Sequence, residues 1–454
     1  MDSIISIEFE EAPSLGSKAA NQSQTGPKLL KAAADGNAEP FKDMAREVIE
    51  SLLTLQTRNT ILHVNIICQE TENASTKFVE EILEICPALL IQVNAKGDTP
   101  LHVAAKFRHS DIVRVLIDRA NLAQHGDEEP ESGVEDARQM IRMVNNKKNT
   151  ALHDAMFPGN MEVVKILTKE DPDYPYSAND YGKTPLYIAA ESESSDMVLT
   201  LLENCTSLSH EGPNGKTALH AAAMHFDLKG DHHAMRQLFE RKKSLLKVTD
   251  QYGWTPIHYA AYHGKYWINA LLEIDQTATN IADKDRKMTA LHLAAGRGHA
   301  RTVETILSLA PECFELVDNR GWNFLHYAVV SFEFPHLKTL LGNPLARILI
   351  NEGDAKGNTS LHVLAAVRPN EFNRYMTRTS HANYMTRTTH AVNDQNVSVG
   401  HIMKYGYPEL LEEIRELSTD VGRGQYPQGA ISRVAKISLH RLAFAFLRDL
   451  SPHG

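Results

Sequence analysis

Two copies of Gly-Lys-Thr, at residues 182–184 and 215–217, are the residues of this sequence that most suggest chemistry. In a phosphate-binding loop these three residues follow another glycine after four intervening positions, so that several backbone N–H groups point at the phosphates. Ser177 and His210 occupy the position of that glycine here. The sequence therefore predicts no nucleotide site. The recurrence of the same three residues indicates a repeated structural element instead.

Other patterns that carry catalysis or metal binding are also missing from the sequence. It contains no H-E-x-x-H, no G-x-S-x-G and no H-R-D. Asp231, His232 and His233 lie together in the stretch 225–233 but lack a third fixed ligand, which favours a solvent-exposed loop over a metal site. Four cysteines are far apart and form no C-x-x-C pair, which suits a reducing cytosol; they are Cys68, Cys86, Cys205 and Cys313. We expect no enzymatic activity, no cofactor and no bound metal.

A tetrapeptide close to Thr-x-Leu-His explains the second Gly-Lys-Thr, because Thr217 opens one copy of it. The nine copies begin at residues 60, 99, 150, 184, 217, 255, 289, 323 and 359. Their spacing has a minimum of 33 or 34 residues. A glycine-containing turn usually precedes each copy, and an apolar stripe with helical spacing follows, as at 111–118, 161–168, 196–203 and 300–307. Each unit is predicted to be a turn followed by two helices.

This unit resembles the ankyrin repeat. The threonine is suited to cap a helix, proline is tolerated at the first helical position, and the leucine points into the core between units. The resemblance implies that the histidine bonds to the threonine hydroxyl and nearby backbone, which assigns structural roles to eight of the 22 histidines. The predicted fold is an all-α ankyrin-repeat solenoid of about nine to ten repeats. Its helix-turn-helix units would have short β-hairpin turns and end in an irregular C-terminal tail.

Four segments are expected along the chain. Residues 1–26 are polar and acidic and are predicted to be disordered. The array is expected over 27–366, with an atypical leading repeat that starts with the helix at 27–37. A polar linker with a tandem nine-residue duplication would occupy 367–406, and a helical tail would occupy 407–454.

An insertion near 122–142 contains six carboxylates within 123–136, all of them in the stretch 125–136. A charge run of this kind is typical of a solvated loop. A docking site for a basic partner is the alternative interpretation.

The tail is expected to contain an acidic helix at 407–417 and a second helix at 431–448. The second helix is apolar with five basic or potentially basic residues, namely Arg433, Lys436, His440, Arg441 and Arg448. It could lie on an anionic membrane surface, dock onto another protein, or pack against the preceding helix or the end of the array. No stretch is long and apolar enough to predict a transmembrane helix, and the N-terminus does not read as a secretory signal.

Three stretches, at 177–191, 213–224 and 316–331, resemble plant ankyrin proteins of the accelerated-cell-death type. Those proteins carry a cytoplasmic ankyrin array followed by a membrane bundle named for a Pro-Gly-Gly motif. The resemblance covers roughly residues 27–366 and implies a role in plant stress or defence signalling at the inner face of the plasma membrane. No Pro-Gly-Gly occurs in this sequence. We therefore expect a cytoplasmic family member that lacks the membrane bundle.

The expected function is that of a scaffold that binds a partner protein on the concave face of the array. A formal net charge of −10 and a pI near 6.1 argue against nucleic acid as a partner. Aromatic and arginine side chains are frequent anchors of protein interfaces. The residues predicted to contact the partner are Tyr181, Tyr252, Trp254, Tyr262, Arg286, Arg297, Arg320 and Trp322.

Three alternatives stay open for this surface and this function. Some of the aromatic residues could instead cover the turn of the next repeat. The protein could self-associate. It could also be a membrane-associated signalling component whose tail contacts lipid or a membrane partner.

Overall fold

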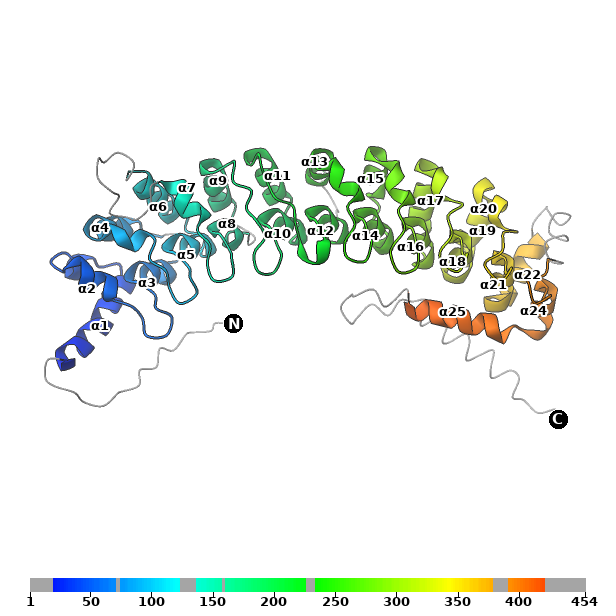
Figure 1. Cartoon of the computed structure of the whole chain (residues 1–454), viewed down its shortest axis with the longest axis horizontal. Coiled ribbons are helices and arrows are strands. Elements are labelled where there is room, and N and C mark those ends of the chain that lie inside the picture. The colour runs from blue at the N-terminus through cyan, green and yellow to red at the C-terminus, as the bar shows by residue number, and fades with distance from the viewer. Residues whose placement is uncertain are drawn as a thin grey trace. The chain divides into compact units, whose positions relative to one another are not determined.

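The computed structural model describes residues 19–70, 74–122, 136–156, 160–225, 233–378 and 391–420. The chain divides into two compact units, Met1–Glu211 and Gly212–Gly454. In each unit the helices form two rows, one of first helices and one of second helices (Figure 1). This confirms the predicted all-α arrangement of helix-turn-helix repeats. The predicted β-hairpin turns are present as isolated β-bridges, such as the one between Gly353 and Thr359. The described ranges contain no β-strand.

In the first unit, successive first helices pack against one another, and so do successive second helices. The leading helix packs on the first helix of the next repeat, as expected for an atypical first repeat. The first helices are α1 (Ala19–Ala34), α3 (Ile61–Cys68), α5 (Pro100–Lys106), α8 (Ala151–Asp154) and α10 (Pro185–Glu191). The other α-helices are α2 (Arg46–Ser51), α4 (Lys77–Ile85), α6 (Ser110–Leu122), α7 (Ala137–Arg142), α9 (Met161–Glu170) and α11 (Ser195–Asn204).

The second unit repeats this pattern. Its first helices are α12 (Ala218–His225), α14 (Pro256–His263), α16 (Ala290–Gly296), α18 (Phe324–Ser331), α21 (Ser360–Val367) and α24 (Val399–Tyr405). They pack in that order. The other α-helices are α13 (His233–Arg241), α15 (Ile268–Ile274), α17 (Ala300–Leu309), α19 (Phe334–Gly342), α20 (Pro344–Leu349), α22 (Pro369–Arg378) and α25 (Pro408–Asp420).

The tetrapeptide starts the first helices in the way the sequence predicted. In α5, the Thr99 hydroxyl accepts a hydrogen bond from the backbone N–H of His102, and Pro100 occupies the first helical position. The same threonine and histidine box occurs at Thr60, Thr150, Thr255, Thr289 and Thr359. The third position of the tetrapeptide is buried in every copy, from Leu62 to Leu361. Gly215-Lys216-Thr217 is confirmed as a turn that leads into a helix, with Gly215 at a φ of +76°.

The helices do not follow two of the predicted segment boundaries. Helix α1 begins at Ala19, within the predicted N-terminal segment 1–26. The predicted linker 367–406 contains α22 and a tenth turn-helix unit that ends in α24. In this unit Ser398 replaces the threonine, and its hydroxyl accepts from the backbone N–H of His401 at 3.1 Å. The repeat persists because the cap is kept although Gly400 replaces the buried leucine.

Several expectations fall on residues outside the described ranges. These are the first eighteen residues, most of the acidic insertion, the Asp231 and His232 pair, most of the nine-residue duplication, and the helix at 431–448. Of the insertion, Asp136 is described and caps α7. The acidic helix at 407–417 is confirmed as part of α25. Among the described helices, none has both the length and the apolar character needed to cross a bilayer.

Candidate protein-binding surface

Each repeat presents a turn, here called its tip, and most tips are built around one aspartate or asparagine. In tip 318–322, the Asp318 carboxylate accepts hydrogen bonds from the backbone N–H groups of Arg320 at 2.9 Å and Trp322 at 2.8 Å. Asn94, Asn145, Asn179, Asp250, Asp354 and Asn393 close their own tips in the same way. These residues precede the capping position by five residues, a regular signal that the sequence analysis did not use.

Neighbouring tips within each unit are joined by main-chain hydrogen bonds. Ala355 N–H donates to the carbonyl of Arg320 at 2.9 Å, and Asp394 N–H donates to that of Lys356 at 3.1 Å. Equivalent bonds run from Ala95 to Thr57, Asn146 to Lys96, Asp180 to Lys147, Gln251 to Asn214, Lys284 to Tyr252 and Asn319 to Arg286. This main-chain ladder fixes the position of each tip relative to the next one in its unit.

Histidines of the tetrapeptide form a second connection between repeats. His292 Nδ1 accepts from the Thr289 backbone N–H at 3.1 Å, which requires an unprotonated Nδ1 and places the proton on Nε2. Nε2 then donates to the carbonyl of Trp322 in the next repeat at 3.0 Å. The same inter-repeat bond is made by His63, His102, His220, His326 and His362.

Burial keeps these imidazoles neutral. It lowers the pKa of five of them to about 4, namely His63, His153, His220, His258 and His292. Burial also lowers the pKa of His102, His326 and His362. The role that the resemblance implied for these histidines is therefore confirmed. Within the described residues, no group of three or more His, Cys, Asp or Glu side chains is placed to hold a metal ion.

Two of the predicted contact residues, Trp254 and Trp322, connect one tip to the next. The Trp322 indole N–H donates to the carboxylate of Asp354 at 3.0 Å, and only 1% of Trp322 is exposed. Trp254 is half-buried and makes the equivalent bond to Asp283. Both residues therefore cover the turn of the next repeat, which was one of the alternatives left open by the sequence.

Tyr262 and Arg297 lie in the same cluster as Trp254. The rings of Trp254 and Tyr262 are 5.5 Å apart, and the Arg297 guanidinium lies 4.5 Å from the centre of the Tyr262 ring. Tyr262 is only 5% exposed. Tyr262 and Trp322 are therefore too deeply buried to contact a partner in the folded array.

The other predicted contact residues lie on the tips and are at least partly accessible. Tyr181, in the first unit, is 59% exposed, and Lys147 lies 5.7 Å from the centre of its ring. Tyr252, Arg286 and Arg320, in the second unit, are half-buried on three successive tips. Lysines that share these tips were not among the predicted contact residues. We call the exposed lysines Lys96, Lys147, Lys148, Lys284, Lys287 and Lys356 the basic tip residues.

Replacing Trp322 by phenylalanine is expected to destabilise the second unit by about 1–3 kcal/mol, because the buried Asp354 carboxylate loses a hydrogen-bond donor. Replacing the exposed Tyr181 by alanine should change stability by less than about 0.5 kcal/mol. Urea denaturation of the two variants and the wild type measures both effects. Equal losses in the two variants would contradict the structural role assigned to the Trp322 indole.

Residues 28–126, 132–211, 203–280 and 268–348 match the family described as Ankyrin repeats (3 copies). The chain belongs to the ankyrin-repeat family. Ankyrin repeats stack on their neighbours and present one long surface, and the proteins that contain them are typically binding modules. The family assignment agrees with the turn, cap and histidine geometry described above.

The chain is similar to ankyrin-repeat relatives of varied roles. It is 23% identical over 207 residues to the Target of rapamycin complex 2 subunit AVO2 of Saccharomyces cerevisiae, covering 44% of this chain and 47% of that protein. It is 27% identical over 225 residues to the B-cell lymphoma 3 protein homolog of Mus musculus, covering 48% of this chain and 46% of that protein. The chain thus spans about half the length of these two relatives.

A plant relative and a solved structure also match. Identity to the Protein ACCELERATED CELL DEATH 6 of Arabidopsis thaliana is 29% over 151 residues, covering 32% of this chain and 21% of that protein. The crystal structure of the ankyrin repeat domain of Bcl-3 matches with a TM-score of 0.43 and 23% identity, covering 54% of this chain and 99% of that chain.

Proposed function

We propose that this protein is an interaction scaffold that binds a partner protein with its tips and first helices, the concave side of an ankyrin solenoid. The observation that carries this proposal is the set of exposed basic tip residues that each unit holds on its own main-chain ladder. Because the ladder fixes the tips before binding, a partner loses less free energy to ordering them. The positive charge of these lysines favours an acidic partner surface. Lys148 shares its charge with Asp180 of the next tip, 3.0 Å away.

The biological setting that we propose is plant stress or defence signalling. It is supported by the likeness to ACCELERATED CELL DEATH 6, which covers about a third of this chain (32%). We propose a cytoplasmic location, supported by the free thiols of all four cysteines, three of them buried. The membrane-associated alternative depends on the helix predicted at 431–448, which lies outside the described residues.

Charge reversal on the tips tests the binding surface. We expect the full-length variants Lys96→Glu/Lys147→Glu, in the first unit, or Lys284→Glu/Lys287→Glu, in the second, to reduce capture of the partner from plant extract by at least about tenfold. Quantitative mass spectrometry of the captured proteins measures this. Thermal unfolding should be unchanged, since these side chains are exposed.

Matched controls carry the same charge change on the second helices. They are Lys165→Glu/Lys169→Glu on α9, and Arg301→Glu/Lys338→Glu on α17 and α19, all at exposed positions. These controls should capture the partner as the wild type does. The proposal fails if both tip variants retain the partner, or if the controls lose it equally.

A further inference from the structure

Helix α25 folds back onto the repeats of its own unit. It packs against α21, and Figure 1 shows it on the side of the first helices. The reversal takes place at Gly406, which follows α24 with a φ of +78°. Only Gly406 and Tyr407 separate the two helices. The last helix of the described chain therefore occupies part of the surface proposed above to bind a partner.

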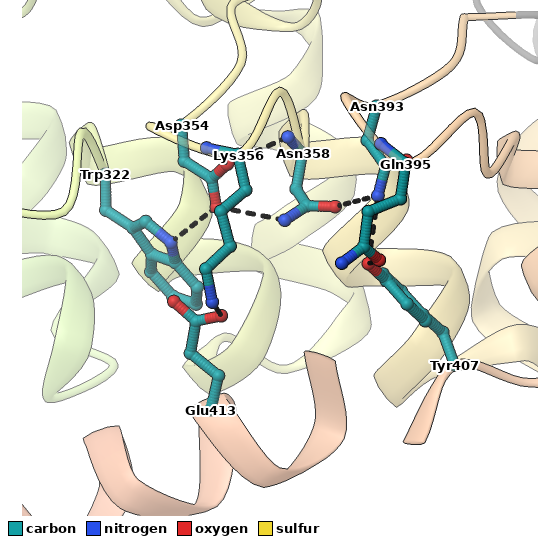
Figure 2. A network of polar contacts seen from close by, with 8 residues as sticks. All are labelled: Trp322, Asp354, Lys356, Asn358, Asn393, Gln395, Tyr407 and Glu413. Carbon is teal, nitrogen blue, oxygen red and sulfur yellow. Dashed lines mark hydrogen bonds and ion pairs between the residues drawn. The ribbon is translucent and has the colours of Figure 1, made fainter. Parts of the chain in front are cut away.

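The contact is apolar on one face of α25. Tyr407, Leu410 and Ile414 are 7%, 1% and 4% exposed and follow the spacing that places side chains on one side of a helix. At the start of the helix, the Tyr407 hydroxyl accepts from Asn393 Nδ2 at 3.1 Å and donates to the Gln395 side chain (Figure 2). Asn393 and Gln395 belong to the tip of the tenth repeat.

Charge complementarity reinforces the contact. Lys356, a basic tip residue, forms an ion pair with Glu413 of α25 at 2.7 Å (Figure 2). The hydrogen bond to Glu413 raises the pKa of Lys356. Glu409 and Glu412 add exposed negative charge to α25. The helix thus combines an apolar face with an acidic one, and it lies where a basic tip meets an apolar first helix.

We propose that this surface, formed by α21 and the tips 354–358 and 393–397 and called the α25 groove, is a binding site for an acidic amphipathic helix. Helix α25 is its intramolecular occupant, and the helix of a partner protein displaces it. Helix-in-groove recognition uses anchors at i, i+3 and i+7, the spacing of Tyr407, Leu410 and Ile414. The short tether gives α25 a high effective concentration at the groove, so a partner must compete with it. This inference rests on the proposed function and names the chemistry of the partner.

A synthetic peptide with the sequence of residues 406–420, carrying a fluorescent label, serves as the partner helix. Full-length protein with Leu410→Asp/Ile414→Asp should bind this peptide at least about tenfold more tightly than the wild type, because its own α25 has lost the apolar anchors. Fluorescence anisotropy measures both affinities. The matched control is Glu412→Gln/Arg415→Gln, which removes an exposed ion pair on α25 and should bind the peptide as the wild type does.

A charge exchange identifies the groove as the site. Adding Lys356→Glu to the Leu410→Asp/Ile414→Asp protein should weaken peptide binding at least about fivefold. A peptide with Glu413→Lys should recover most of that loss on the Lys356→Glu protein. The inference is overturned if the Leu410→Asp/Ile414→Asp protein binds the peptide no better than the wild type. It is also overturned if Lys356→Glu leaves the affinity for the peptide unchanged.

A zero-length carbodiimide cross-link provides a readout that needs no variant of α25. It should join Lys356 to Glu413 in the wild type, and excess unlabelled peptide should reduce the yield. A yield that excess peptide leaves unchanged would show that α25 is not displaceable. If the peptide fails to bind while the tip variants still lose the captured partner, this inference fails and the proposed function stands. If the peptide binds but the tip variants keep the partner, the proposed function fails.

Discussion

Acidification from about pH 7 to about pH 4 is expected to destabilise both units strongly, because the buried tetrapeptide histidines bind protons more readily in the unfolded chain. Their ordinary pKa is 6.5, and burial lowers it to about 4 in five of them. A group whose pKa is depressed by folding stabilises the fold above its unfolded pKa. This stabilisation is lost as the pH falls from 6.5 to 4.

The magnitude follows from these values. A difference of about 2.5 pKa units corresponds to about 3 kcal/mol per histidine below pH 4, and to about 2 kcal/mol at pH 5. Asp154 acts in the opposite direction, because burial raises its pKa to about 7 and protonation relieves the cost of its buried charge. At pH 5 this one carboxyl offsets roughly what one histidine loses.

The two units should therefore respond differently. The first unit contains His63, His102 and His153 together with Asp154. The second contains His220, His258, His292, His326 and His362, together with Asp283, whose pKa burial also raises. We expect the second unit to lose hydrogen-exchange protection at a higher pH than the first. Hydrogen exchange with mass spectrometry at a series of pH values measures this. Equal stability of the second unit at pH 7 and pH 4.5 would contradict the assigned protonation state.

Replacement of Gly321 by alanine adds a single carbon atom, but we expect it to destabilise the second unit strongly. Gly321 has a φ of +81°, and a Cβ there would lie 2.7 Å from the backbone nitrogen of Ala355. That nitrogen donates the ladder bond to Arg320. The alanine must adopt a left-handed conformation and also push the next tip away, for a combined cost of about 3 kcal/mol or more.

Gly36 provides the matched control for this prediction. Its φ is +71°, close to that of Gly321, and the nearest atom to a Cβ there would be the side-chain nitrogen of Asn65, at an ordinary contact distance of 3.8 Å. Gly36→Ala should therefore show the conformational cost alone, about 1 kcal/mol. Urea denaturation of the two variants separates the two effects. A cost for Gly321→Ala no greater than that for Gly36→Ala would show that the ladder does not constrain the tips.

The sequence predicted the features that each repeat carries within itself. The period, the threonine cap, the buried leucine and the position of each turn follow from local residue order, and the structure confirms them. The tenth repeat escaped detection because Ser398-Val399-Gly400-His401 keeps the cap but lacks the leucine that made the other copies recognisable.

Features that depend on two repeats could not be obtained in this way. Trp322 was correctly predicted to lie in a turn. Its hydrogen bond to the carboxylate of Asp354 could not be predicted, because Asp354 belongs to the next tip. Similarly, the acidic helix at 407–417 was predicted, whereas its docking on Lys356 depends on the direction in which Gly406 turns the chain. Contacts between segments are set by packing, which residue spacing along the chain does not encode.

The main-chain ladder has a consequence for how such a protein diversifies. Since the ladder bonds join peptide groups, most outward-facing residues of a tip can be exchanged with little effect on these bonds. Tyr252, Arg286 and Arg320 all supply a ladder carbonyl despite their different side chains. Substitutions on the tips can therefore change which ligand is bound while the repeat fold that carries the tips stays the same.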